Sequence, residues 1–210
     1  MNINITYAIT VCNEFVEIQR LMSFLLLHKR KQDNIVVLYD EANGDPEVEE
    51  FLRTHSLNGE FAWHKAKFEN HFANWKNRLS SLCNGDYIFQ IDADEVPHEK
   101  LIETLPYILE ENHGDVEVYQ VPRVNTVEGL TESHIAKWGW NIDNEKRINW
   151  PDYQWRIWRH KPEIKWINKV HERLDGFKVW SPLPQMVEYS LYHPKTIDRQ
   201  ERQNNYYELI

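Results

Sequence analysis

Short apolar runs of strand-like residues alternate with amphipathic segments over the first 121 residues. The amphipathic segments repeat apolar residues at spacings of three and four, and the strand-like runs are rich in Val, Ile and Tyr. Such alternation predicts a doubly wound α/β fold with a mostly parallel central sheet, flanked by helices and joined by right-handed crossovers. We expect strands over residues 3–11, 35–39, 60–64, 87–91 and 116–121, and helices over 15–29, 47–54, 70–82 and 97–111.

Three polar residues lie at the ends of expected strands. Asn13, Asp40 and Asp92 each stand at a predicted carboxyl end. The carboxyl ends of parallel strands meet at one edge of the sheet, and ligands of doubly wound sheets bind beyond that edge. We therefore expect these three side chains to share one rim around a ligand site.

The strand at 87–91 is followed by three carboxylates, Asp92, Asp94 and Glu95, within four positions. Carboxylates this close repel one another, and they stay ionised only where solvent, hydrogen bonds or a cation offset the repulsion. Two oxygen ligands on one side of a turn are typical of a Mg²⁺ or Mn²⁺ site that leaves positions open for substrate phosphates. An acidic turn that caps the following helix is the alternative, and these residues alone leave both open.

Length, charge and cysteine content exclude several classes of protein. The chain has 210 residues, which fits one domain with a sizeable core, and its formal net charge of -9 argues against binding to a nucleic-acid backbone. A single nucleotide stays compatible with that charge, because a divalent cation screens its phosphates. No run approaches the ~20 apolar residues of a membrane span, and residues 1–11 lack the features of a signal peptide. With two cysteines in unrelated contexts, we expect a reducing, cytoplasmic compartment and no integral membrane segment.

The second half of the chain lacks the regular alternation. Residues 125–150 are polar and contain tryptophan without clear periodicity, which indicates a loop-rich insertion or lid. Residues 154–159 alternate as a strand, and a last strand is expected over 187–192, ending in His193. Residues 198–209 have the pattern of a terminal helix.

Seven short segments, spread over most of the chain, together form a recognisable ordered set. The segments are Val11-Cys12-Asn13-Glu14, 36–40 with Asp45, 75–79, 85–87, 90–95, Trp155-Arg156 and Val170-His171-Glu172. In this order they resemble the family-2 glycosyltransferases of GT-A fold, the Rossmann-like fold of nucleotide-diphospho-sugar transferases, with Asp92-Ala93-Asp94 as the DXD motif. The last two segments are similar to the branch that includes lipopolysaccharide-core β-glucosyltransferases. The resemblance implies a single GT-A domain over 1–210, with a nucleotide-binding half over 1–97 and an acceptor half over 98–210 that contains the 125–150 insertion.

The resemblance also implies a donor and a metal. The donor would be a nucleoside-diphosphate sugar, most often UDP-linked, and the metal Mn²⁺ or Mg²⁺. Asp94 would ligate the metal directly, and Asp92 would lie near the ribose and the metal. His193 would be a third ligand, with His171 as its rival and a purely structural histidine as the alternative. Three further residues carry over by position: Thr10 and Asp40 to the uracil, and Lys76 to the base or diphosphate. Apart from the resemblance, Asn13 is expected both to cap the first helix and to line the site, with a cap alone as the alternative.

Sugar transfer also needs a base for the acceptor hydroxyl. Glu172 is the expected base, because a carboxylate beside His171 and Trp166 has the partly apolar surroundings that suit this role. A surface ion pair of Glu172 with Arg173 or Lys169 is the alternative. The candidates for stacking on sugar rings, with a place in the core as their alternative, are Trp138, Trp140, Trp155 and Trp158.

Together these features predict a metal-dependent transferase of glycan biosynthesis. It would move a hexose from a UDP-sugar, UDP-glucose being favoured, to a glycan or other hydroxyl acceptor, with inversion at the anomeric carbon. A non-catalytic domain that binds a nucleotide sugar or a carbohydrate is the alternative, and turnover separates the two. A nucleotidyltransferase is disfavoured, because it would carry a glycine-rich, basic triphosphate loop after the first strand, where Val11-Cys12-Asn13-Glu14 stands.

Overall fold

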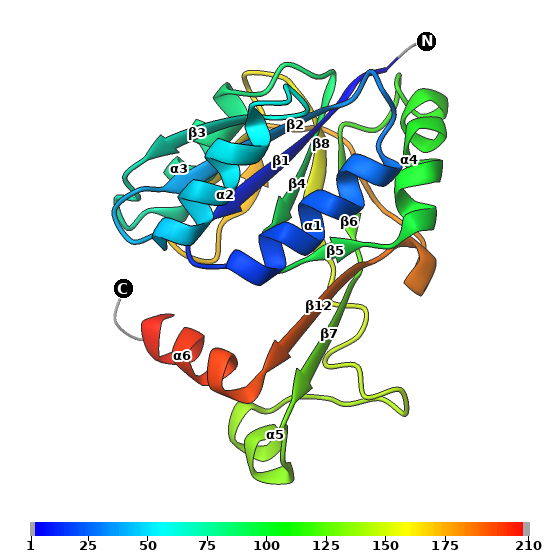
Figure 1. Ribbon diagram of the computed structural model, residues 1–210. Coiled ribbons are helices and arrows are strands. Elements are labelled where there is room, and N and C mark those ends of the chain that lie inside the picture. Colours follow the sequence, from blue (N-terminus) through cyan, green and yellow to red (C-terminus); the bar gives the residue numbers. More distant parts are fainter. Residues whose placement is uncertain (1–2, 208–210) are drawn as a thin grey trace.

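A computed structural model describes residues 3–207, and a seven-stranded sheet forms the centre of this part of the chain (Figure 1). From one edge to the other its strands are β11 (Trp180–Pro182), β6 (Val118–Val121), β8 (Gln154–Arg159), β4 (Tyr87–Asp92), β1 (Ile5–Val11), β2 (Asn34–Asp40) and β3 (Ala62–Ala66). The four strands β1 to β4 are parallel, whereas β8 is antiparallel to both of its neighbours. The predicted α/β class with a mostly parallel sheet is confirmed.

Helices cover both faces of this sheet (Figure 1). They are α1 (Phe15–His28), α2 (Pro46–Ser56), α3 (Phe72–Ser81) and α4 (Glu99–Glu111). Tyr7 and Ile9 of β1 pack with α1, α2 and α4 on one face, while Ala8 between them packs with α3 on the other. Because successive strand residues enter opposite cores, β1 has the continuous apolar sequence of a strand that is buried on both faces.

A second sheet has the order β5 (Val96–Pro97), β12 (Leu191–Thr196), β7 (Arg123–Glu128). The expected strand over 187–192 was wrong at both ends, because Val187–Tyr189 form a 3₁₀ turn and the strand continues through His193 to Thr196. A proline at position 194 does not end the strand. Strand β5 pairs with residues 191 and 192 alone, so at position 194 β12 pairs only with β7. The other edge of β12 is unpaired there and needs no backbone N–H donor, which proline lacks.

The region 125–150 contains more regular structure than the expected loop-rich insertion. It includes most of β7 and helix α5 (Glu132–Trp138), and single bridges join Ile148 to Asn125 and to Ile142. Periodicity is weak here because β7 is only partly buried and no residue of α5 is buried. With β12 and helix α6 (Ile197–Tyr207), these elements lie to one side of the central sheet (Figure 1).

The remaining elements complete the path of the chain. A short antiparallel hairpin, β9 (Lys165–Ile167) and β10 (Arg173–Asp175), packs in the core of the α3 face. The predicted helix over 198–209 corresponds to α6, and positions 208 and 209 lie outside the described residues. Among the helices of the described part, none is long and apolar enough to cross a bilayer.

Candidate active site

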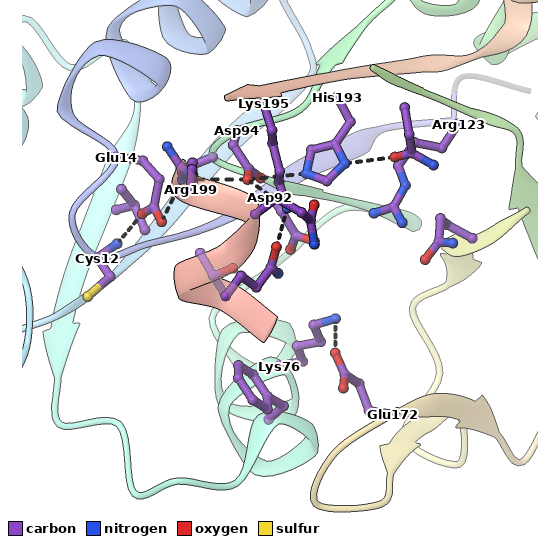
Figure 2. A pocket seen from close by; sticks show the side chains of 18 of the residues that line it. Cys12, Glu14, Lys76, Asp92, Asp94, Arg123, Glu172, His193, Lys195 and Arg199 are labelled. Atoms are coloured by element: carbon purple, nitrogen blue, oxygen red, sulfur yellow. Dashed lines mark hydrogen bonds and ion pairs between the residues drawn. The ribbon is translucent and has the colours of Figure 1, made fainter. Parts of the chain in front are cut away.

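A cavity of about 1160 Å³ lies at the carboxyl ends of the parallel strands. Asn13, Asp40 and Asp92 all line it, so the residues that end β2 and β4 share one rim with the loop after β1, as the sequence predicts. Other lining residues come from β7, from the loop between β9 and β10, and from β12 and α6. Figure 2 shows side chains from both halves of the chain gathered around this space.

A buried arginine ties Asp92 to the core. Arg156 of β8, only 3% exposed, donates to Asp92 Oδ2 at 2.6 Å and to Glu95 Oε1 at 2.7 Å. Glu95 is fully buried and also accepts from Arg123 at 3.0 Å. A third of the Asp92 side chain stays exposed (33%), and burial of the rest raises the pKa of the carboxyl, but Arg156 and Lys76 outweigh burial and lower this pKa to about 2.

Asp94 faces nitrogen groups from the last strand and helix (Figure 2). Its Oδ2 lies 3.2 Å from His193 Nε2, 3.5 Å from the Arg199 guanidinium and 3.8 Å from Lys195 Nζ. Burial raises the pKa of the Asp94 carboxyl, but these neighbours outweigh burial and hold it well below its usual range. Burial lowers the pKa of His193, even though the Asp94 carboxylate beside it acts in the opposite direction.

Asp94 and His193 fit a divalent cation. A carboxylate oxygen and a neutral imidazole nitrogen are both electron-pair donors, and here they face each other at 3.2 Å. Within residues 3–207, no three His, Cys, Asp or Glu side chains come close enough together to form a metal site by themselves. A cation at this pair would complete its coordination with water and substrate phosphates, as Mg²⁺ usually does. Of the two histidines considered from the sequence, His193 contacts Asp94, and His171 is exposed in the β9–β10 loop.

The expected base Glu172 lies in the same cavity and forms an ion pair with Lys76 of α3. Both side chains are largely enclosed, with 15% and 8% of their surfaces exposed. The Lys76 ammonium also lies over the ring of Trp166, 4.5 Å from its centroid, in a cation–π contact. In Figure 2 this pair is separate from the group around Asp94. The sequence singles out both residues of the pair without indicating that they contact each other.

Asp40 organises two loops at the end of β2. Its Oδ1 accepts backbone N–H bonds from Ala42 at 3.0 Å and from Phe68 at 3.1 Å, and its Oδ2 accepts from the Asn43 side chain at 2.8 Å. The first of these loops needs a glycine, because a Cβ at Gly44 would lie 2.4 Å from the Asp40 carbonyl oxygen. The carboxylate that the sequence assigns to the uracil therefore also holds the loops that border its part of the cavity.

Thr10 and Asn13 line the cavity beside Asp40, at the end of β1. The expectation that Asn13 caps α1 was wrong, because the N-cap residue is Glu14. The Glu14 carboxylate accepts from the backbone N–H groups of Cys12 at 2.8 Å and Asn13 at 3.1 Å. This leaves the Asn13 side chain at the rim, without a capping role.

The four tryptophans divide between the cavity and the core. Trp140 and Trp155 line the cavity, whereas Trp158 is 1% exposed and belongs to the core. Trp138 stacks on His134 at 5.2 Å and contacts the Trp140 ring at 4.6 Å. Two of the four are therefore placed for contact with a bound sugar.

Several charged residues of the site were not assigned a role from the sequence. Arg156 had a usable signal, because an arginine inside an alternating strand needs a buried counter-charge. For Glu95 the sequence indicates only a third carboxylate after the strand at 87–91. Nothing in the local pattern marks Lys195 or Arg199, which reach Asp94 only through the folding of β12 and α6.

The sheet order, the helices on both faces and the carboxylates at the strand ends define an α/β protein of the GT-A type. The sequence pattern of "Glycosyl transferase family 2" matches residues 6–177. The chain therefore belongs to glycosyl transferase family 2, a family of enzymes.

Solved structures of the same fold include residues 1–349 of TarS from S. aureus. The complex of TarS with UDP superposes with a TM-score of 0.59 at 10% identity, over 91% of this chain and 60% of that chain. The complex with UDP-GlcNAc gives a TM-score of 0.56 at 12% identity, over 93% of this chain and 59% of that chain. The present chain thus spans about 60% of the length of that TarS chain. Comparison with curated proteins gives no match.

Proposed function

We propose that this chain is a metal-dependent glycosyltransferase that moves a hexose from a UDP-sugar to a glycan or other hydroxyl acceptor. The observation that carries the proposal is the meeting of Asp92, Asp94, His193 and Glu172 in one cavity of a family 2 domain. The cavity volume of about 1160 Å³ is large enough for a nucleotide sugar and part of an acceptor.

The donor nucleotide would lie along the rim of β1 and β2. Thr10, Asn13 and Asp40 line that part of the cavity and offer polar groups for a base. TarS, which shares the fold, was crystallised with UDP and with UDP-GlcNAc, and this supports UDP as the first nucleotide to test. UDP-glucose as donor, and kinship with lipopolysaccharide-core β-glucosyltransferases, rest on the sequence resemblance.

Asp94 and His193, with Asp92 beside them, would hold Mn²⁺ or Mg²⁺. When bound, this cation supplies positive charge that stabilises the diphosphate as it leaves. Lys195 and Arg199 lie on the same side of the cavity, and their positive charges would contribute to binding the diphosphate.

The chain's own residues would carry the remaining chemistry. The acceptor hydroxyl oxygen forms a bond to the anomeric carbon, the bond from that carbon to the diphosphate breaks, and UDP takes the electron pair. Glu172 accepts the proton of the hydroxyl. A single displacement of this kind inverts the anomeric configuration. Lys76 must separate from Glu172 for this to happen, and the negative charge of a bound donor gives its ammonium another partner.

The ion pair of Glu172 with Lys76 also favours the second candidate, a non-catalytic domain that binds nucleotide sugars. A carboxylate held permanently by an ammonium would not act as a base. The two functions are separated by turnover, since a binding domain retains the donor without releasing UDP.

The test begins with binding and continues with turnover. Thermal shifts with UDP, GDP, CDP and dTDP, each with and without Mn²⁺, should be largest for UDP with Mn²⁺. Asp94→Asn should lower the rate of UDP release from UDP-glucose by about 10²–10³-fold, the scale of losing one charge-stabilising group. Asp175→Asn, which changes an exposed carboxylate outside the cavity, is the matched control. Unchanged UDP release by Asp94→Asn would refute the metal role.

Glu172→Gln tests the base. It should reduce turnover by about 10²–10⁴-fold while donor binding stays within a few-fold of the unchanged protein. NMR of the product then reports the anomeric configuration, and retention would contradict the single displacement. Donor binding without any UDP release by the unchanged protein would favour the binding domain.

A further inference from the structure

The surroundings of His193 fix where its proton lies. His193 is 9% exposed, and its ring has a close polar neighbour at each nitrogen. Nδ1 lies 2.8 Å from Asn125 Oδ1, and Nε2 lies 3.2 Å from Asp94 Oδ2. Which nitrogen carries hydrogen depends on what each neighbour can donate or accept.

The Asn125 amide has only one orientation that satisfies its own contacts. On the side away from His193, its Nδ2 donates to Asp152 Oδ2 at 2.6 Å. The Asp152 carboxylate is an acceptor for every group around it, because Arg123 donates to the same oxygen at 2.8 and 2.9 Å and Gln154 donates to Oδ1 at 2.9 Å. Reversing the amide would place its carbonyl oxygen against that carboxylate, so Oδ1 must face His193.

An amide oxygen only accepts hydrogen bonds, so the His193 nitrogen that faces it must carry a proton. This holds for the neutral and the charged imidazole alike, because both forms can carry hydrogen on Nδ1. In the neutral form the lone pair is then on Nε2, and it points toward Asp94 Oδ2. Two acceptors at this separation repel each other unless a proton or a bound cation lies between them.

We propose that Asn125 and Asp152 are positioning residues that hold His193 as its Nδ1–H tautomer and direct the Nε2 lone pair toward Asp94. The pair is thereby prepared for a divalent cation, and this part of the inference rests on the proposed function. Ligating histidines are commonly oriented by a carbonyl or carboxylate at their second nitrogen. Here the carbonyl belongs to Asn125 of β7, and its orientation is set by Asp152 in the segment before β8. A strand of the small sheet and a loop next to the central sheet together orient a side chain of β12.

The tautomer can be read directly in the metal-free protein. Long-range ¹H–¹⁵N NMR of the full chain with labelled histidine distinguishes Nδ1–H from Nε2–H, and the spectrum of His193→Gln assigns the signals by their loss. The unchanged protein should have the proton on Nδ1. Asn125→Leu should move it to Nε2, which then donates to Asp94. Gln154→Leu removes another donor to Asp152 without touching His193, and it should leave the tautomer as it was.

Calorimetric titration with Mn²⁺ in the presence of UDP gives the second readout. Asn125→Leu should weaken Mn²⁺ binding by about 10–100-fold, and Gln154→Leu by no more than about threefold. An Nε2–H tautomer of His193 in the unchanged protein would overturn the inference, and this result does not depend on the folding of any variant. An Asn125→Leu protein with the same His193 tautomer and the same Mn²⁺ affinity as the unchanged protein would also overturn it. If the tautomer is Nδ1–H but Mn²⁺ does not bind, the cation role inferred for Nε2 is wrong, and so is the metal of the proposed function. Sugar transfer itself is still tested separately, by the loss of UDP release in Glu172→Gln.

Discussion

Asp92 and Asp94 are two residues apart, yet different parts of the molecule hold them. The central sheet holds Asp92 through Arg156, at 2.6 Å and almost fully buried. The small sheet and α6 hold Asp94 through Lys195 at 3.8 Å and Arg199 at 3.5 Å, and they place His193 Nε2 3.2 Å from it. The first arrangement has one short contact to a buried arginine, and the second has longer contacts, although the Asp92 side chain is more exposed (33%) than that of Asp94 (14%). Asp92 is therefore fixed by the fold, whereas Asp94 has contacts that a ligand can replace.

The strongest test of this difference is Arg156→Met. Removing the guanidinium leaves Asp92 and the fully buried Glu95 without their shared partner, so the free energy of unfolding should fall by about 3–5 kcal/mol. Urea unfolding followed by circular dichroism measures this. Arg159→Met is the matched control in the same strand, because Arg159 donates to the Tyr87 hydroxyl at 3.0 Å. It should cost about 0.5–1.5 kcal/mol, and equal losses for the two variants would remove the distinction.

Acid should weaken the contact at Asp92 in a defined pH window. Because its pKa is lowered to about 2 in the folded protein, ionised Asp92 stabilises the fold above pH ~4, and this contribution is lost as the pH falls toward 2. Since a third of the side chain is exposed, we expect a contribution of about 1–2 kcal/mol after solvent screening. The difference in unfolding free energy between the unchanged protein and Asp92→Asn should therefore shrink between pH 5 and pH 2. A difference that stays constant across this range would contradict the assignment.

The smallest effect is expected at Arg199. This side chain is 24% exposed and pairs with Glu17, with Glu14 at 3.2 Å and with Asp94 at 3.5 Å. Arg199→Met should lower the free energy of unfolding by less than about 1 kcal/mol, because partly exposed ion pairs contribute little. Hydrogen exchange should nevertheless become faster in α6, because Arg199 links this helix to Glu14 and to Glu17 of α1. A loss as large as that of Arg156→Met would mean that both aspartates are held equally firmly.

The same division separates what the sequence predicts from what it does not. Strands β1, β2 and β4 and the rim of Asn13, Asp40 and Asp92 follow from local patterns, because a buried parallel strand and its carboxyl end are both visible in a short window. The contacts within the site are not local. Lys76 and Glu172 are 96 residues apart, and Arg156 and Asp92 are 64 apart.

The bounds of the last strand, β12, could not be predicted from the local sequence pattern. Its true limits, residues 191–196, include Pro194, a residue that propensity places outside strands. Only the pairing with β7 explains why the strand continues past His193. The local pattern could place the histidine close to the site, but it could not predict its contact with Asn125 or the contact of Asn125 with Asp152.

The distance along the chain between Asp94 and His193 has a consequence for biosynthesis. Their contact spans 99 residues. At about 5–20 residues per second, a ribosome adds the histidine roughly 5–20 s after the aspartate. During that interval the nascent α/β layer carries its acidic loop without the strand that completes the small sheet, and the contact between Asp94 and His193 cannot yet form.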